Sequence, residues 1–134
     1  MNVVLAMLLG VWQYDGFFFD GHRYPNPNPE FELTFTFTET ESRLKWHRED
    51  PTQFCERTAS YTLENSVLTQ TVTWLNPDNE SSCSQDPDMQ MGRTTSSPIR
   101  FAGEELQLVL SLDGKEFLYI LKRPASSSIL PGSF

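Results

Sequence analysis

Few residues in this sequence could carry out chemistry. The chain contains only two histidines, His22 and His47, and they lie far apart along it. The sequence has no glycine-rich phosphate loop, no nucleophile elbow and no cluster of histidine and cysteine. Scattered carboxylates on alternating segments are usually solvated surface rather than metal ligands. We therefore expect no metal, no cofactor and no catalytic residue; an isomerase or hydrolase that uses an interior tyrosine or carboxylate is the enzymatic alternative.

Arg57 is the residue best suited to a binding role. Residues 53–63 alternate in polarity, and the alternation places Arg57 on the same face as Ala59 and Tyr61, which we expect to be buried. A buried guanidinium needs a partner. It would pair with an internal carboxylate, reach the rim of the fold, or bind the acidic headgroup of a ligand together with Tyr61 and with Gln70 of the next strand.

The two cysteines, Cys55 and Cys83, are predicted to form a disulfide. The turn at residues 64–66 predicts a hairpin that places Cys55 opposite about residue 75, so the loop that follows brings Cys83 close to it. Paired cysteines in a small domain are typical of proteins outside the reducing cytosol. We therefore expect a periplasmic or secreted protein. The apolar residues 1–9 lack a charged start and are too short to span a bilayer, so we expect an export signal to be absent from this sequence.

The composition restricts the class of protein and of partner. With 134 residues the chain has the size of one domain, and its ten Phe, four Tyr and three Trp favour strands over helices. Ten basic residues against 18 acidic ones give a formal charge of −8, which opposes binding to nucleic acid or to an anionic membrane. The composition thus predicts an acidic all-β protein with no nucleic-acid partner and no transmembrane segment.

Alternating polarity predicts eight strands. The clearest is residues 31–38, whose odd positions are apolar and even positions polar. Three prolines within residues 22–30 remove hydrogen-bond donors, so we expect an unpaired loop there. In the weakest strand, residues 96–98 predict a bulge or an edge. The expected strands are residues 9–19, 31–38, 42–49, 53–63, 67–75, 90–101, 104–112 and 116–123.

A meander of eight short strands with no helix between them closes naturally into a barrel. The predicted fold class is therefore all-β, an eight-stranded antiparallel up-and-down β-barrel. Periodicity alone does not tell whether the apolar face of each strand points inward or toward lipid, so an eight-stranded outer-membrane barrel is the alternative architecture.

The beginning and the end of the predicted barrel resemble the lipocalin (calycin) family. Gly10-x-Trp12 stands at the start of the first strand, and Lys122-Arg123 ends the last one. The resemblance implies that Trp12 plugs the closed end of the barrel and that a basic residue packs across its ring. Arg123 is the better match for this basic residue. The resemblance also implies that the loop after the first strand folds over the open mouth. It covers residues 8–123, with residues 1–7 as a lead-in over one barrel end and residues 124–134 as a tail. The family's middle Thr-Asp motif has no counterpart, which points to a divergent bacterial-type relative.

The lipocalin-like resemblance implies binding rather than catalysis. We expect non-enzymatic binding of a small hydrophobic or amphipathic ligand inside the barrel, entering beneath residues 22–30. A haem-binding barrel with a similar opening takes its iron ligand from a histidine near the C-terminus, where this sequence has none. The alternative is a solid-core structural or protein-interaction domain that contacts a protein partner through the loop at residues 20–30. The expected ligand contacts, on the inner faces that strict alternation assigns, are Tyr14, Phe18, Phe35, Phe37, Trp46, Arg57, Tyr61, Gln70, Trp74, Leu108 and Tyr119.

Overall fold

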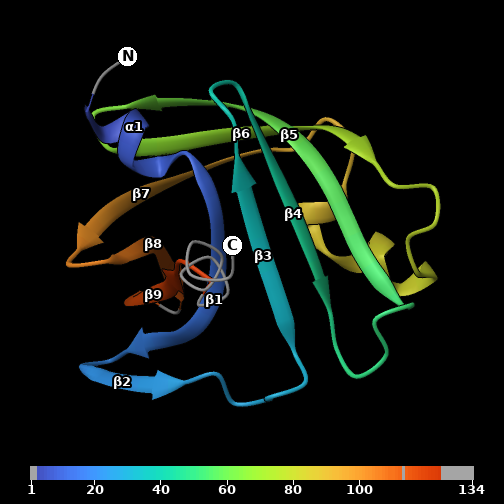
Figure 1. The fold of residues 1–134 in the computed structure, drawn as a ribbon, viewed down its shortest axis with the longest axis horizontal. Coiled ribbons are helices and arrows are strands. Elements are labelled where there is room, and N and C mark those ends of the chain that lie inside the picture. Colours follow the sequence, from blue (N-terminus) through green and yellow to red (C-terminus); the bar gives the residue numbers. More distant parts are fainter. Residues whose placement is uncertain (1–2, 113, 125–134) are drawn as a thin grey trace, which may run out of the picture.

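The first and last long strands of the chain pair with each other and close the sheet into a barrel (Figure 1). The computed structural model describes residues 3–112 and 114–124, so of the predicted tail only Pro124 lies within the described residues. The strands pair in the order β2-β1-β3-β4-β5-β6-β7-β8-β9, and the pairing of β1 with β9 completes the ring. The predicted eight-stranded antiparallel barrel is confirmed, with β2 as a short addition. The elements are α1 (Val3–Leu8), β1 (Gly10–Phe19), β2 (His22–Pro25), β3 (Glu32–Phe37), β4 (Glu41–His47), β5 (Phe54–Glu64), β6 (Val67–Leu75), the short 3₁₀ helices η1 (Ser81–Gln85) and η2 (Pro87–Met89), β7 (Thr94–Ala102), β8 (Glu105–Leu112) and β9 (Lys115–Lys122).

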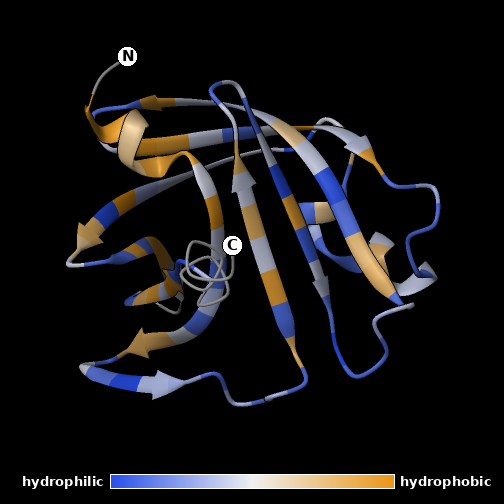
Figure 2. Ribbon diagram, viewed as in Figure 1, coloured by the Kyte–Doolittle hydropathy of each residue, from blue (hydrophilic) through white to orange (hydrophobic). Residues whose placement is uncertain are grey.

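The apolar face of the strands points into the barrel. Along β3, Leu33, Phe35 and Phe37 are buried while the threonines between them are only partly covered, and Figure 2 shows the alternation as bands along this strand. This is the period-two pattern of a strand with one dry and one wet face. The core cluster consists of Leu8, Trp12, Leu33, Phe35, Phe37, Leu44, Cys55, Tyr61, Leu68, Cys83, Met89, Ile99, Leu106, Leu108 and Leu121.

The helix α1 packs against one end of the barrel. Its last residue, Leu8, is fully buried, and the carbonyl oxygen of Leu8 accepts a hydrogen bond of 2.8 Å from the indole Nε1 of Trp12. The helix has six residues. Within residues 3–112 and 114–124, no helix is long and apolar enough to cross a membrane.

The expected loop at residues 22–30 begins with a strand. His22–Pro25 forms β2 and pairs with the second half of β1, from Phe19 opposite His22 to Gly16 opposite Pro25. The prediction that this segment does not pair is wrong for its first four residues, because the first proline stands at the strand's end, where a missing donor is tolerated. Asp20 and Gly21 have φ values of 49° and 84°, as a two-residue type I′ hairpin requires.

Of the bulge or edge expected at residues 96–98, β7 shows the edge, since residues 94–98 pair with β6 and have no register partner in β8. Thr94–Ala102 is one continuous strand that includes Pro98. Its first half pairs with β6, where Pro98 is the last partner, and its pairing with β8 begins only at Ile99. Pro98 therefore lies where one ladder ends and the next begins, so its missing N–H breaks neither ladder.

A β-bulge in β1 changes which aromatic side chains face the interior. The register of β1 against β9 shifts directly after Tyr14 and leaves Asp15 as the extra residue. Beyond the bulge the ring of Phe17 stacks at 5.2 Å on Phe117, a residue on the inner face of β9. The prediction that Phe18 faces the interior is therefore wrong, because one extra residue exchanges the two faces of a strand.

A second bulge, in β6, has the same effect on a tryptophan. Ala59 pairs with Val72, but Thr58 pairs with Trp74, so Thr73 is the extra residue. Trp74 is consequently on the outer face and 41% exposed. The prediction that Trp74 lines the barrel interior is wrong, since strict alternation along β6 ends at Thr73.

Candidate functional site

Arg57, from the inner face of β5, lies in the barrel interior. It is 3% exposed and is the only buried charged side chain among the described residues. Its Nη1 donates to the carbonyl oxygen (3.2 Å) and the hydroxyl (2.9 Å) of Ser42, and its Nη2 donates to Oε1 of Gln70 (3.2 Å). The Ser42 hydroxyl also donates to the same Gln70 oxygen at 2.6 Å. Three adjacent strands, β4, β5 and β6, thus hold the guanidinium in a small polar network.

This network leaves the charge of Arg57 without a direct counter-ion. No carboxylate of the described residues lies within 4.0 Å of the guanidinium, and its Nε is buried with no hydrogen-bond acceptor. Burial lowers the pKa of Arg57 to about 10, while the carboxylates of Asp88 and Asp86 act in the opposite direction from farther away. A desolvated cation with an unused donor is an arrangement that favours an anionic ligand.

Tyr61 shares the inner face of β5 with Arg57 but does not join the network. Its register partner across the hairpin is Gln70, as the predicted cluster requires. Its hydroxyl, however, donates to the backbone carbonyl of Thr38. The structure therefore brings Arg57 and Gln70 together and directs the polar end of Tyr61 elsewhere.

A pocket of about 200 Å³ opens at the mouth of the barrel, beside the loop that follows β2. The ring of Tyr14 lies 5.3 Å from that of Tyr119 and 5.8 Å from that of Phe31. Burial raises the pKa of Tyr14 to about 12, and Tyr119 adds to the shift. The lining of this mouth pocket consists of Tyr14, Asn26, Pro27, Asn28, Phe31, Arg48 and Tyr119.

The segment between β6 and β7 contributes side chains to the barrel core. Met89, in η2, is 2% exposed and belongs to the core cluster. The predicted disulfide is confirmed: Cys55 of β5 is bonded to Cys83 of η1, with their Cα atoms 5.7 Å apart. The disulfide therefore ties this segment to the strand that carries Arg57.

Asp88 lies next to Met89 and faces solvent at the same end of the barrel. Desolvation by the surrounding protein and the nearby Asp86 raise its pKa, whereas Arg57 lowers it. Desolvation, followed by the charges of Asp88 and Asp86, also raises the pKa of Tyr119. The carboxylates of Asp86 and Asp88 thus act on both the buried Arg57 and the pocket residue Tyr119.

The residues of the Gly-x-Trp resemblance lie at the other end of the barrel. Trp12 is 3% exposed beneath α1. Arg123 donates from Nη1 to the carbonyl of Val11 and from Nη2 to the carbonyl of Met7, each at 3.0 Å. These contacts join α1, β1 and the residue that follows β9. They hold the closed end of the barrel together and are separate from the Arg57 network.

The remaining predicted contacts fill the barrel. Phe35, Phe37 and Leu108 are buried, and Trp46 and Tyr119 are partly buried against the same cluster. The ring planes of Phe35 and Phe37 are nearly parallel, with centroids 5.6 Å apart. The interior around Arg57 is therefore aromatic and well packed.

The sequence-based selection missed two residues of the site. Ser42 is fully buried and binds Arg57, and the alternation with Leu44 and Trp46 already placed it on the inner face of β4. Met89 reaches the core from a loop, where no periodic pattern exists to reveal it. Ser42 could have been found from the sequence, whereas the burial of Met89 depends on the path of the loop.

Comparison with solved structures identifies the fold. A lipocalin-like protein from Bacteroides uniformis ATCC 8492 matches with a TM-score of 0.60 at 15% identity, over 88% of this chain and 99% of that chain. An uncharacterised protein from Bacteroides eggerthii DSM 20697 matches with a TM-score of 0.53 at 14% identity, over 87% of this chain and 98% of that chain. No family model matches the sequence, and no curated protein matches it. At these identities the similarity establishes the architecture, and the chain has a lipocalin-like β-barrel fold.

Proposed function

We propose that this barrel binds a small amphipathic molecule with an acidic headgroup and catalyses no reaction on it. The observation that carries the proposal is the buried guanidinium of Arg57, which has no carboxylate partner among the described residues and an Nε without an acceptor. A carboxylate accepts two parallel hydrogen bonds from arginine and would supply both the missing acceptor and the missing negative charge. Eight-stranded barrels of this size hold either side chains or one small ligand.

The ligand would enter through the mouth pocket. Tyr14, Tyr119 and Phe31 offer aromatic surface there, beside the loop after β2. The pocket measures about 200 Å³, below the ~300 Å³ at which most small-molecule sites begin. Arg57 is not part of the lining of this pocket, so a headgroup that reaches it must displace core side chains, which favours a narrow, single-chain ligand over a bulky one.

The Cys55–Cys83 disulfide supports an extracytoplasmic site of action. Disulfides persist in the periplasm and outside the cell and are rare in a reducing cytosol. We infer that the protein binds its ligand in the periplasm or outside the cell.

The test is displacement of a fluorescent fatty acid by decanoic acid and by decanol, measured on the wild type and on Arg57→Met. We expect decanoic acid to displace the probe from the wild type and to bind at least ~30-fold more weakly to Arg57→Met, since a charge-assisted hydrogen bond in a desolvated site contributes about 2 kcal/mol or more. Decanol, which lacks the charge, should bind both proteins similarly.

Arg100→Met is the matched control, because Arg100 is half-exposed on β7 and pairs with Glu116. Arg100→Met should leave the affinities for decanoic acid and for decanol unchanged. Thermal melting of Arg57→Met should show equal or higher stability, since no ion-paired carboxylate is orphaned and Ser42 remains bonded to Gln70. If decanoic acid does not displace the probe from the wild type, or binds Arg57→Met equally well, the acidic-ligand proposal is wrong and a solid-core interaction domain becomes the better description.

A further inference from the structure

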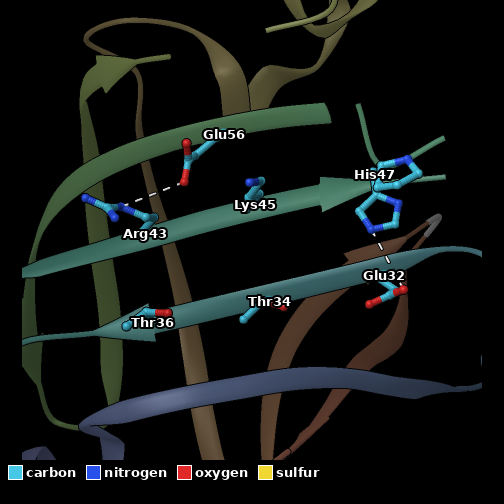
Figure 3. A pocket seen from close by; sticks show the side chains of 8 residues that line it. Glu32, Thr34, Thr36, Arg43, Lys45, His47 and Glu56 are labelled. Atoms are coloured by element: carbon cyan, nitrogen blue, oxygen red, sulfur yellow. Dashed lines mark ion pairs between the residues drawn. The ribbon is translucent and has the colours of Figure 1, made fainter. Parts of the chain in front are cut away.

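A hollow on the outer face of the barrel is polar and electrically balanced. It has a volume of about 430 Å³ and lies over β3 and β4. Its lining sets the carboxylates of Glu32 and Glu56 against the cations of Arg43 and Lys45. Glu56 lies 4.0 Å from Arg43, and Glu32 lies 3.8 Å from His47 (Figure 3). This hollow offers little to an apolar chain, and exposed apolar surface lies instead at the mouth of the barrel.

The sheet extends beyond the barrel at one side of the mouth. The pairing of β1 with β3 ends at Gln13, and the second half of β1 turns away from β3 and pairs with β2 (Figure 1). The pairing of β8 with β7 ends at Leu108 and Ile99, whereas β8 and β9 remain paired as far as Leu112 and Lys115. The ends of β8, β9, β1 and β2 therefore form a four-stranded extension of the sheet.

The inner face of this extension is mostly aromatic. Two rows of register partners cross it, one made of Leu110, Phe117, Phe19 and His22 and the other of Leu108, Tyr119, Phe17 and Tyr24. Directly opposite residues of paired strands share a face, so each row lies on one side of the sheet. We call the following side chains of the two rows the aromatic shelf: Phe17, Phe19, Tyr24, Leu110 and Phe117.

The rings of the aromatic shelf contact one another and the mouth pocket. Phe17 stacks on Tyr24 on one side and on Phe117 on the other, with centroid distances of 5.0 and 5.2 Å. The ring of Phe117 also lies 5.9 Å from that of Phe19 and 5.5 Å from that of Tyr119. Because Tyr119 lines the mouth pocket, the shelf continues directly from that pocket.

The aromatic shelf is exposed although it continues the core face of its strands. Leu110 is 37% exposed, while Leu106 and Leu108 on the same face are buried, because β8 has no partner in β7 beyond Leu108. Tyr24, at the opposite edge of the shelf, is 41% exposed. Contiguous exposed apolar surface of this kind marks a binding surface.

We propose that the aromatic shelf holds the far end of a long, unbranched acyl chain whose acidic headgroup is bound by Arg57. This inference rests on the proposed function. The mouth pocket measures only about 200 Å³, so much of a long chain must lie outside it. Along β9 the shelf runs roughly 13 Å from Tyr119 to Lys115, where the ion pair of Lys115 with Asp20, 3.2 Å apart, ends the apolar surface.

The experiment compares palmitic acid with decanoic acid as competitors of the fluorescent fatty acid. Palmitic acid has six more methylene groups, and we expect it to bind the wild type at least ~30-fold more tightly, since each methylene removed from water favours binding. We call this ratio of affinities the chain-length gain. Because the gain comes from the chain and not from the headgroup, it should be equally large on Arg57→Met, although both acids should bind that variant more weakly.

Variants of the shelf locate the far end of the chain. Tyr24→Ala combined with Leu110→Ala should reduce the chain-length gain at least fivefold and change the affinity for decanoic acid less than twofold. Both side chains are well exposed, so thermal melting should show this double variant folded. Phe117→Ala, which removes the central ring, should reduce the gain further. Trp74→Ala is the matched control and should leave the gain unchanged, since Trp74 is as exposed as Tyr24 but lies on the outer face.

The outcomes separate this proposal from the acidic-ligand proposal. An equal chain-length gain on the wild type and the double variant, or no gain on the wild type, would overturn the shelf proposal and leave the acidic-ligand proposal standing. If Arg57→Met binds both acids as tightly as the wild type while the double variant loses the gain, the acidic-ligand proposal fails and the shelf remains an apolar site. No displacement by either acid overturns both proposals.

Size-exclusion chromatography tests a second copy of this chain as the occupant of the shelf. We expect the wild type and the double variant to elute alike. A wild-type dimer that Tyr24→Ala with Leu110→Ala dissociates would overturn the proposal and make the aromatic shelf an interface between two copies.

Discussion

The guanidinium of Arg123 lies over the indole of Trp12, with its Cζ 3.8 Å from the ring centroid. The two residues come from opposite ends of the sequence and meet at the end of the barrel that α1 covers. Gly10 makes this approach feasible: a Cβ at position 10 would lie 2.9 Å from Nη1 of Arg123, and the φ of Gly10 is +104°. The Gly-x-Trp pattern and the final arginine therefore act as one structural unit.

Trp12→Ala should destabilise the protein by about 3–5 kcal/mol, because it removes a buried aromatic ring and leaves a cavity. It also removes the partner of Arg123, a contact worth ~1 kcal/mol. Urea denaturation measures the difference. Trp74→Ala is the control and should change the stability by no more than ~0.5 kcal/mol, since Trp74 is partly exposed on the outer face. Equal effects of the two substitutions would contradict the structural role of Trp12.

Gly10→Ala should destabilise the protein more than Gly103→Ala. Both glycines have positive φ, +104° and +61°, but a Cβ at position 103 meets nothing within 4 Å. Gly103→Ala therefore costs about 1–2 kcal/mol for left-handed backbone alone, whereas Gly10→Ala must also push Arg123 away from Trp12. Denaturation curves of the two variants, measured side by side, test the difference, and a smaller loss for Gly10→Ala would refute it.

Native protein made under exporting conditions should contain no free thiol. Reduction of the bond between Cys55 and Cys83, which are separated by 28 positions, should lower the stability by about 3 kcal/mol through loop closure. Thiol titration before and after denaturation checks the first statement, and melting with and without reductant checks the second. Two titratable thiols in the unreduced native protein would refute both the bond and the inferred location.

Tyr14 should titrate about two units above an ordinary tyrosine. Its folded-state pKa is raised from 10.0 to about 12 by burial and by Tyr119. Because the folded protein holds this proton more tightly than the unfolded chain, the associated stability is fully present below pH 10 and is lost as the pH rises toward 12. The phenolate absorbance of the wild type minus that of Tyr14→Phe measures the titration. A midpoint near 10 would show that the mouth pocket leaves Tyr14 hydrated.

The sequence alone determined those parts of the structure that depend on one strand at a time. The alternation in residues 31–38 and 53–63 is a property of each segment, and it correctly placed Phe35, Phe37 and Arg57 inside the barrel. The pairing of Cys55 with Cys83 followed from one local hairpin, whose register fixes which residues lie opposite each other.

Only the tertiary structure decided where the register between two paired strands shifts by one residue. The extra residues Asp15 and Thr73 are visible in the register between strands and not in the polarity of either strand, and they turned Phe18 and Trp74 to the outer face. Met89 is in the core because the segment after β6 folds back over the barrel, a path that no local pattern encodes. A bulge and a loop path are set by the free energy of packing distant segments together, so period-two alternation identifies the strands but not every inward-facing side chain.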